Sequence, residues 1–146
     1  MKTPCYIFDL DGTIADCNHR LHYINQKPKD WNAFNREIIN DPPIHDVLSL
    51  LHILKDLFTV LLVTARGEGC REETVAWLEL HDISYDGLYM RGKDDYRHDD
   101  IVKEEILDNL LSMGYDIKGV FEDRNRVVAM WRRRGIRCYQ VIDGNY

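Results

Sequence analysis

The sequence contains no apolar run that approaches the roughly 20 residues of a transmembrane helix. Its first residues, Met1-Lys2-Thr3-Pro4, lack the apolar core of a signal peptide and lead straight into a predicted strand. We therefore expect a cytoplasmic protein that makes no contact with a membrane.

Patterns typical of zinc sites and disulfides are also missing. The four cysteines form no C-x-x-C pair, and two of them, Cys5 and Cys138, fall in predicted core strands. None of the six histidines has a convincing spacing for zinc ligation. We expect reduced, buried thiols rather than disulfide bonds or a zinc site.

Two nucleotide-binding signatures are absent, namely G-x-x-x-x-G-K-[ST] and G-x-G-x-x-G. Positive charge is scarce too, because 19 lysines and arginines stand against 25 acidic residues and leave a net charge of -6. This balance argues against a broad electrostatic grip on nucleic acid. It is compatible with a local basic cleft, since much of the positive charge lies in the last third of the chain.

What the sequence does contain is an alternation of predicted strands and helices along 146 residues, the length of one domain. Residues 44–57 carry a helical apolar stripe, and the β-branched run at 58–63 is typical of a strand buried on both faces. The alternation predicts an α/β fold with a parallel sheet of about five strands and helices on both faces. We expect strands at 4–9, 58–63, 87–90, 117–121 and 137–142, and helices at about 31–39, 44–57, 71–80, 99–111 and 127–134.

Residues 13–43 do not fit this alternation. Residues 13–30 are polar and show no clear period, 31–39 form a short predicted helix, and Asp41-Pro42-Pro43 ends it. We expect a loop or small flap with a helical insert over the end of the first strand, and no large cap domain. Tyr23 is a candidate for stacking on a base, whereas Trp31 and Phe34 are interpreted as packing residues.

Ligands of a parallel α/β sheet bind beyond the carboxyl ends of its strands. Several charged or hydroxyl side chains fall at these ends, and Lys103, at the start of a predicted helix, reaches the same rim. The residues expected at the strand ends are Asp9, Asp11, Thr64, Arg66, Arg91, Glu122 and Asp123. The sequence therefore predicts one crevice lined by these side chains.

The stretch Phe8-Asp9-Leu10-Asp11-Gly12-Thr13 is central to this crevice. Residues i and i+2 of a strand share a face, so Asp9 and Asp11 are expected to point the same way. Two adjacent carboxylates favour a proton or a cation between them, and Mg²⁺ is a hard, oxygen-binding ion that meets this need. The spacing excludes an EF-hand, while a surface turn remains an alternative for this stretch taken alone.

A carboxylate cluster with one hydroxyl and one lysine suits phosphoryl transfer through a covalent aspartyl-phosphate. The motifs D-x-D-G-T, Thr64, Lys103 and Asp123, in this order, resemble those of the haloacid dehalogenase-like (HAD) phosphohydrolases, which have a Rossmann-like fold. The resemblance implies that Asp9 is the nucleophile and a Mg²⁺ ligand. It implies that Asp11 is the general acid and base, with its main-chain carbonyl on the metal. It also implies that Thr64 holds a phosphate oxygen, Lys103 neutralises the aspartyl-phosphate, and Asp123 is a metal ligand.

The last third of the chain resembles more closely the phosphatase domain of phage polynucleotide kinase, through Arg97-x-Asp99-Asp100-Ile101-Val102-Lys103 and Glu122-Asp123-Arg124-x-x-Val127-Val128. This resemblance implies removal of 3′-phosphates from nucleic-acid ends, with Thr13, Arg66, Arg91 and Arg124 as substrate contacts. The chain departs from the family at Glu122, where an aspartate is usual, and we assign Glu122 to the outer shell of the site. No P-loop precedes the first strand, so no kinase domain is expected.

The leading hypothesis is a Mg²⁺-dependent phosphomonoesterase that acts on phosphorylated DNA or RNA ends, beside a separate kinase or ligase. An alternative of the same class is a phosphatase for mononucleotides or other small phosphate esters, which the acidic net charge favours. An alternative of another class is a non-catalytic regulatory or binding domain with this fold. The presence of all the catalytic motifs argues against that third reading.

Overall fold

Five strands form a single sheet in the order β3-β2-β1-β4-β5, and every neighbouring pair is parallel. The coordinates are a computed structural model that describes residues 1–146. The strands are β1 (Thr3–Phe8), β2 (Thr59–Gly67), β3 (Gly87–Arg91), β4 (Tyr115–Arg124) and β5 (Cys138–Gly144). The predicted α/β class and the five parallel strands are confirmed.

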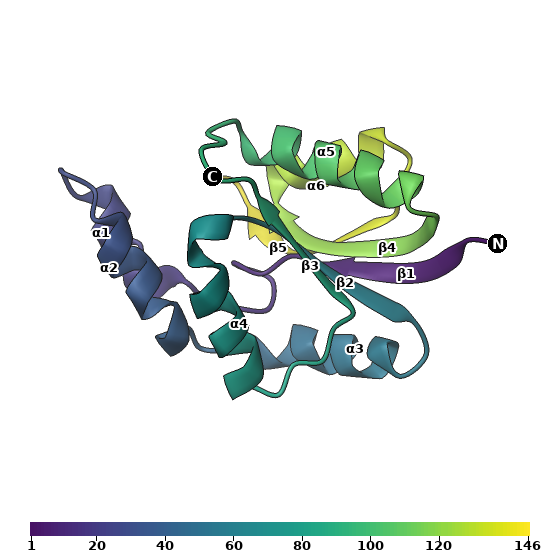
Figure 1. Cartoon of the computed structure of the whole chain (residues 1–146), viewed down its shortest axis with the longest axis horizontal. Helices are drawn as coiled ribbons and strands as arrows, with labels where there is room; N and C mark the ends of the chain where they lie inside the picture. Colours follow the sequence, from purple (N-terminus) through teal and green to yellow (C-terminus); the bar gives the residue numbers. More distant parts are fainter.

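Two helical layers enclose the sheet, with α3 and α4 on one face and α5 and α6 on the other (Figure 1). These helices are α3 (His45–Lys55), α4 (Arg71–Leu80), α5 (Asp99–Ser112) and α6 (Asn125–Arg133). Each layer has its own apolar core. Each core contains one fully buried tryptophan, Trp77 of α4 in one and Trp131 of α6 in the other. Burial on both faces explains the continuous apolar runs in the central strands, such as Val60 to Val63 of β2.

Two of the central strands extend further than their apolar runs predict. β2 continues past the run at 58–63 to Gly67, and β4 continues to Arg124, so both carry polar residues into the crevice. The helix predicted at 31–39 is divided into α2 (Trp31–Arg36) and the 3₁₀ helix η2 (Glu37–Asn40). A further 3₁₀ turn, η3 (Glu68–Cys70), joins β2 to α4.

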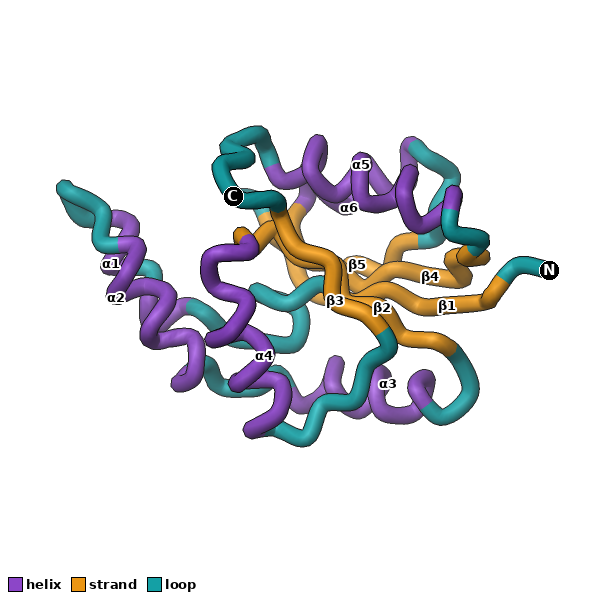
Figure 2. The backbone as a smooth tube through the Cα atoms, viewed as in Figure 1, coloured by secondary structure: helices purple, strands orange, loops and turns teal.

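The predicted flap is a helical arm that projects from the body of the domain on the α4 side (Figure 2). We define the arm as residues 18–40, which comprise η1 (Asn18–Arg20), α1 (His22–Asn25), α2 and η2. An isolated bridge from Ala15 to Pro43 joins the two segments that flank the arm, and a second bridge ties Ala15 to Asp11. Its root packs on α4, where the Trp77 indole donates a hydrogen bond to the Asp41 carbonyl over 2.8 Å.

The strand order places the carboxyl ends of β1 and β4 side by side at the centre of the sheet. The chain runs from β1 outward to β2 and β3, and then returns to the other side of β1 as β4 and β5. Such a reversal is a topological switch point, where α/β sheets bind their ligands. None of the helices combines the length and the apolar character needed to span a membrane.

Candidate active site

Three buried carboxylates meet at the switch point. Phe8 of β1 pairs with Phe121 of β4, so Asp9 and Glu122 follow at the same level, and the Asp9 amide donates to the Phe121 carbonyl over 3.0 Å. Asp123 is the next residue of β4. Carboxylate oxygens of Asp9, Glu122 and Asp123 all lie within 4.8 Å of one another.

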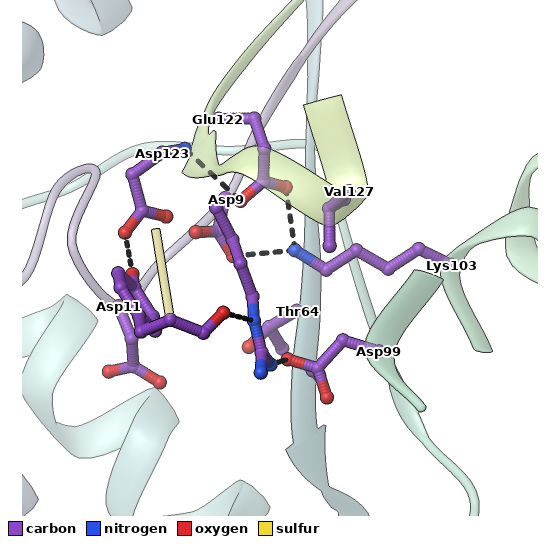
Figure 3. A pocket seen from close by; sticks show the side chains of 11 residues that line it. Asp9, Asp11, Thr64, Asp99, Lys103, Glu122, Asp123 and Val127 are labelled. Carbon is purple, nitrogen blue, oxygen red and sulfur yellow. Dashed lines mark hydrogen bonds and ion pairs between the residues drawn. The ribbon is translucent and has the colours of Figure 1, made fainter. Parts of the chain in front are cut away.

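Lys103 is the cation of this cluster. Its side chain extends from α5 so that the ammonium lies 2.8 Å from Asp9 Oδ1 and 2.8 Å from Glu122 Oε2 (Figure 3). Lys103 is only 2% exposed, which is rare for lysine and requires paired charges. The two ion pairs fix the Asp9 carboxylate relative to β4.

The charges of the cluster shift one another's pKa values. Burial, and then repulsion by Glu122, raise the pKa of Asp9 to about 7. Burial and the negative charge of Asp9 raise the pKa of Asp123 to about 6. Burial alone would lower the pKa of Lys103, but attraction by Asp9 and Glu122 outweighs burial and raises it. Three carboxylates therefore share one lysine, and the site is short of positive charge.

The donor set fits a divalent cation. Asp9, Glu122 and Asp123 offer only hard carboxylate oxygens, the ligand type that Mg²⁺ prefers, and a single lysine leaves two of their charges without balance. The side chain of Asp11 is not part of this group of ligands. Glu122, expected in the outer shell, lies among the carboxylates that would hold the ion.

The Asp11 carboxylate points away from the cluster, toward two arginines. Arg66 binds it with two hydrogen bonds, Nε to Oδ2 at 3.0 Å and Nη2 to Oδ1 at 2.6 Å, and Arg20 Nη2 adds a third at 3.0 Å. Burial would raise the pKa of Asp11, but the two guanidinium groups outweigh it and hold this pKa below its ordinary value. In this conformation Asp11 is an ionised carboxylate.

Asp41 fixes both arginines from the other side. Its carboxylate accepts from Arg20 Nε at 2.8 Å and from Arg66 Nη2 at 3.2 Å, and His19 Nε2 lies 2.7 Å away. Arg66 also donates to the hydroxyl of Thr74 on α4 over 3.1 Å. Arg20, Asp41 and Arg66 are all buried. This ionic network joins the root of the arm to β2 and holds Asp11 in place.

Two threonines supply hydroxyl groups next to the carboxylates. Thr13 Oγ1 donates to Asp9 Oδ2 over 3.2 Å, while the Thr64 hydroxyl accepts from the Arg66 amide over 3.1 Å and lines the cavity. The turn that leads from β1 to Thr13 depends on Gly12, whose φ of +81° suits glycine. A Cβ at Gly12 would collide with the Asp123 carboxylate.

The predicted contacts Arg91 and Arg124 lie on the rim, both bound to Asp99. Arg91 Nη2 donates to Asp99 over 2.8 Å, and its other nitrogens bind main-chain carbonyls, including that of Ala65. Arg124 pairs with Asp99 and also donates to the Tyr146 carbonyl over 2.8 Å. Arg124 lines the cavity. Arg91 does not, because its guanidinium is bound to the loop before α5.

Tyr146 closes the site on the β4 side. Its hydroxyl donates to the Asp123 carboxylate, and its ring lies beneath the Arg124 guanidinium, 5.4 Å from ring centre to Cζ. The cavity, which opens to solvent, has a volume of about 70 Å³, room for about two water molecules. Its lining residues are Asp9, Asp11, Thr64, Ala65, Asp99, Lys103, Glu122, Asp123, Arg124, Val127 and Tyr146.

The structure brings together most of the predicted residues and adds four that sequence reasoning missed. Asp9, Asp11, Thr64, Lys103, Glu122, Asp123 and Arg124 line the cavity, Thr13 touches Asp9, and Arg66 touches Asp11. The missed residues are Arg20, Asp41, Asp99 and Tyr146. Asp99 is part of the motif at 97–103 that resembles the phage phosphatase domain, but the sequence analysis assigns it no role in the site.

Comparisons with known proteins agree with this geometry. Residues 3–146 match the family described as the polynucleotide kinase PNKP phosphatase domain. A bifunctional polynucleotide kinase/RNA ligase of Autographa californica nuclear polyhedrosis virus is 30% identical over 127 residues, which cover 85% of this chain and 17% of the viral protein. A chain in the structure of the Pnkp1/Rnl/Hen1 complex is 31% identical, with a TM-score of 0.84 over 99% of this chain and 47% of that chain.

More distant structures share the fold. A haloacid dehalogenase-like hydrolase from Streptococcus pneumoniae has a TM-score of 0.68 at 16% identity, over 95% of this chain and 84% of that chain. The chain spans less than half the length of the viral protein and of the Pnkp1/Rnl/Hen1 chain. Because the family match covers almost every residue that builds the sheet and the site, this chain belongs to the family of PNKP phosphatase domains, HAD-type hydrolases.

Proposed function

We propose that this protein is a Mg²⁺-dependent phosphomonoesterase that removes 3′-phosphates from nucleic-acid ends. The observation that carries the proposal is the setting of Asp9. This carboxylate is held between Lys103 and Thr13, beside two further carboxylates, at the floor of a cavity of about 70 Å³. A group held in this way is positioned to attack phosphorus and is too enclosed to serve as a surface ligand.

In the proposed reaction an Asp9 oxygen attacks the phosphorus in line, and the bond from phosphorus to the 3′-oxygen breaks. This transfer leaves an aspartyl-phosphate on Asp9 and a 3′-hydroxyl on the nucleic acid. Mg²⁺ held by Asp9, Asp123 and Glu122 would offset the charge of the phosphate against these carboxylates. Lys103 and the Thr64 hydroxyl hold the phosphoryl oxygens.

Asp11 moves the protons in this scheme. When its carboxyl turns from Arg66 toward the cavity that it lines, Asp11 takes up a proton from water and gives this proton to the departing 3′-oxygen. The resulting carboxylate then takes a proton from the water that attacks the aspartyl-phosphate. The products are inorganic phosphate and free Asp9. Arg66 and Arg20 hold Asp11 between these steps.

The size of the cavity and the names of the relatives support a nucleic-acid substrate. The cavity of about 70 Å³ is smaller than a typical site for a whole small molecule and opens to solvent, so the phosphate fits inside while the rest of the substrate extends outward. Two relatives are described as a polynucleotide kinase/RNA ligase and as part of an RNA repair complex. They support the further proposal that this protein acts beside a kinase or ligase in the repair of nucleic-acid ends.

The test is a set of substrates assayed with and without Mg²⁺. We expect kcat/KM to be highest for a 3′-phosphorylated oligonucleotide, lower for its 5′-phosphorylated counterpart and for mononucleotides, and negligible after chelation. A preference for free nucleotides would instead support the small-substrate alternative, which the net charge of -6 favours. No hydrolysis of any substrate with Mg²⁺ would contradict catalysis itself.

The nucleophile is tested by Asp9→Asn. The amide cannot form the acyl-phosphate, so turnover of every substrate should fall by at least about a thousandfold. The fold should survive, because Lys103 keeps its ion pair with Glu122. Circular dichroism verifies the fold, and p-nitrophenyl phosphate serves as the general substrate. Hydrolysis near the wild-type rate would refute the assignment of Asp9.

A further inference from the structure

The outer part of the arm has exposed aromatic and basic side chains that no element of the domain covers. Residues 25–32 are all exposed, and Trp31 exposes 53% of its surface, whereas Trp77 and Trp131 expose none. Trp31 therefore packs within the arm, as the sequence interpretation allows, but it is not part of a core and keeps more than half of its surface exposed. Its ring forms a T-shaped pair with Phe34, with ring centres 5.6 Å apart, and Lys29 Nζ lies 5.7 Å from its ring centre.

The charge of the arm is opposite to that of the whole chain. Residues 18–40 contain four lysines and arginines against two acids, whereas the chain has 19 against 25. Lys27, Lys29 and Arg36 form no ion pair within the protein. By contrast, Arg133 and Arg134 at the end of α6 pair with Glu104 and Asp108. The arm thus offers three free cations, Lys27, Lys29 and Arg36, to a polyanion.

The exposed Trp31 is connected to the catalytic residues through the partly buried Phe34. Phe34 lies under the guanidinium of Arg20, with 4.2 Å from Cζ to the ring centre, and the same guanidinium binds Asp11 over 3.0 Å. Asp30 holds the outer end of the arm in shape, because its carboxylate caps α2 at the Ala33 amide and its own amide binds the Tyr23 carbonyl. A chain of contacts through Arg20 and Phe34 therefore connects Asp11 to Trp31.

We propose that the arm binds the single-stranded part of the nucleic-acid substrate, with Trp31 as the platform on which a base stacks and Lys29 and Lys27 as phosphate contacts. Stacking on aromatic rings next to cations is how single strands are held without sequence preference. This inference rests on the proposed function, because it assigns to the arm the part of the substrate that the small cavity cannot hold. It replaces Tyr23, which is only partly exposed, as the expected stacking residue.

Binding is tested by tryptophan fluorescence with an oligonucleotide that has a 3′-hydroxyl and no phosphate. A base stacked on Trp31 should quench the emission of the one exposed tryptophan, and Trp31→Phe should remove the saturable quenching. Lys29→Ala should weaken binding and lower its salt dependence by about one counterion. Lys2→Ala, just before the amino end of β1 and away from the arm, is the matched control. It should change neither the affinity nor its salt dependence. Absence of saturable quenching in the wild type would overturn the proposal.

Activity gives a second readout. Trp31→Ala should lower kcat/KM for a 3′-phosphorylated oligonucleotide about tenfold, mainly through KM, and leave p-nitrophenyl phosphate hydrolysis unchanged. Leu57→Ala, which removes an exposed apolar side chain before β2, should affect neither substrate. Equal loss on both substrates, or no loss on either, would refute the platform. If the wild type prefers mononucleotides, the proposed function fails, and the quenching experiment still decides whether the arm binds single strands.

Discussion

Glu122 is 1% exposed, and each of its carboxylate oxygens has a partner, Lys103 Nζ for Oε2 and the Asp123 amide for Oε1. A buried carboxylate with this geometry both orients Lys103 and adds a third negative oxygen beside Asp9 and Asp123. At the residue scale, Glu122 therefore belongs to the group of carboxylates that could hold a cation, and it also orients Lys103.

We predict that Glu122→Gln weakens Mg²⁺ binding by more than about 100-fold, beyond the tenfold to 100-fold typical of outer-shell partners. The amide keeps the size of the side chain and removes the charge. Titration calorimetry with Mg²⁺ measures this effect without reference to activity. A change smaller than tenfold would mean that Glu122 acts only by holding Lys103.

The cysteines give a pH prediction at the same scale. Burial, and then the negative charge of Asp11, raise the pKa of the Cys17 thiol to about 12, and burial raises the pKa of Cys5 and Cys138 to about 12 as well. A raised pKa suppresses the reactive thiolate at neutral pH. Labelling of the native protein at pH 8 should be at least about tenfold slower per thiol than in urea, and should accelerate with pH up to about 12.

Labelling with a disulfide reagent, followed by absorbance, measures this rate for all four thiols. Cys17→Ser is the informative control, because Cys17 is the least buried of the four. If one thiol reacts at the rate of free cysteine at pH 8 and this fast reaction is lost in Cys17→Ser, the environment assigned to Cys17 is contradicted.

At the scale of elements, Asp41 joins the arm to the catalytic strands. It lies just after η2 and binds Arg20 of η1 and Arg66 of β2. Asp41→Ala leaves two buried guanidinium groups with Asp11 as their main carboxylate partner. Removal of one member of a buried ionic network costs about 3–5 kcal/mol, and we predict a loss of this size in the free energy of unfolding.

Urea denaturation measures that loss, and Asp56→Ala, at an exposed position after α3, should change the free energy by less than about 0.5 kcal/mol. We also expect lower kcat for Asp41→Ala on p-nitrophenyl phosphate, because Asp11 then binds both arginines without competition. Unchanged stability would indicate that water replaces the Asp41 carboxylate.

The same elements explain how far the sequence predicts this site. Asp9, Thr64 and Asp123 each follow a β-branched or aromatic run, and a parallel sheet brings the ends of such runs together. The position of Lys103 is predictable as well, because the alternation of strands and helices places a helix start after β3, and Lys103 lies in the first turns of that helix. Periodicity predicts the strands and helices, and the parallel topology brings these positions to one edge of the sheet, but their roles come from the resemblance to HAD phosphohydrolases.

Arg20 and Asp41 do not follow from periodicity. Arg20 lies in a polar stretch without a repeat, and a fully buried arginine is rare, so no pattern predicts its burial. Its partner is 21 positions away, beside two prolines that indicate only the end of a helix. Tyr146 is missed for a similar reason, since its hydroxyl meets Asp123 only because β5 ends beside β4.

For the whole molecule, the unbalanced carboxylates predict that Mg²⁺ stabilises the fold. An ion that binds only the folded state adds about 2.7 kcal/mol at 100 times its Kd. For a domain of 146 residues this corresponds to a rise in Tm of roughly 5–10 °C. Differential scanning fluorimetry with Mg²⁺ and with chelator measures it. The effect should largely vanish in Glu122→Gln, and an equal rise in that variant would indicate binding elsewhere.

Each of the two cores beside the sheet contains one tryptophan, whose fluorescence reports on that core. Trp77 reports on the layer of α3 and α4, Trp131 on the layer of α5 and α6, and Trp31 stands apart on the arm. In a Trp31→Phe background, replacing either remaining indole by phenylalanine leaves a single emitter on one side of the sheet. Comparing the melting curves of these two proteins then reveals whether the two halves of the domain unfold as one cooperative unit or in succession.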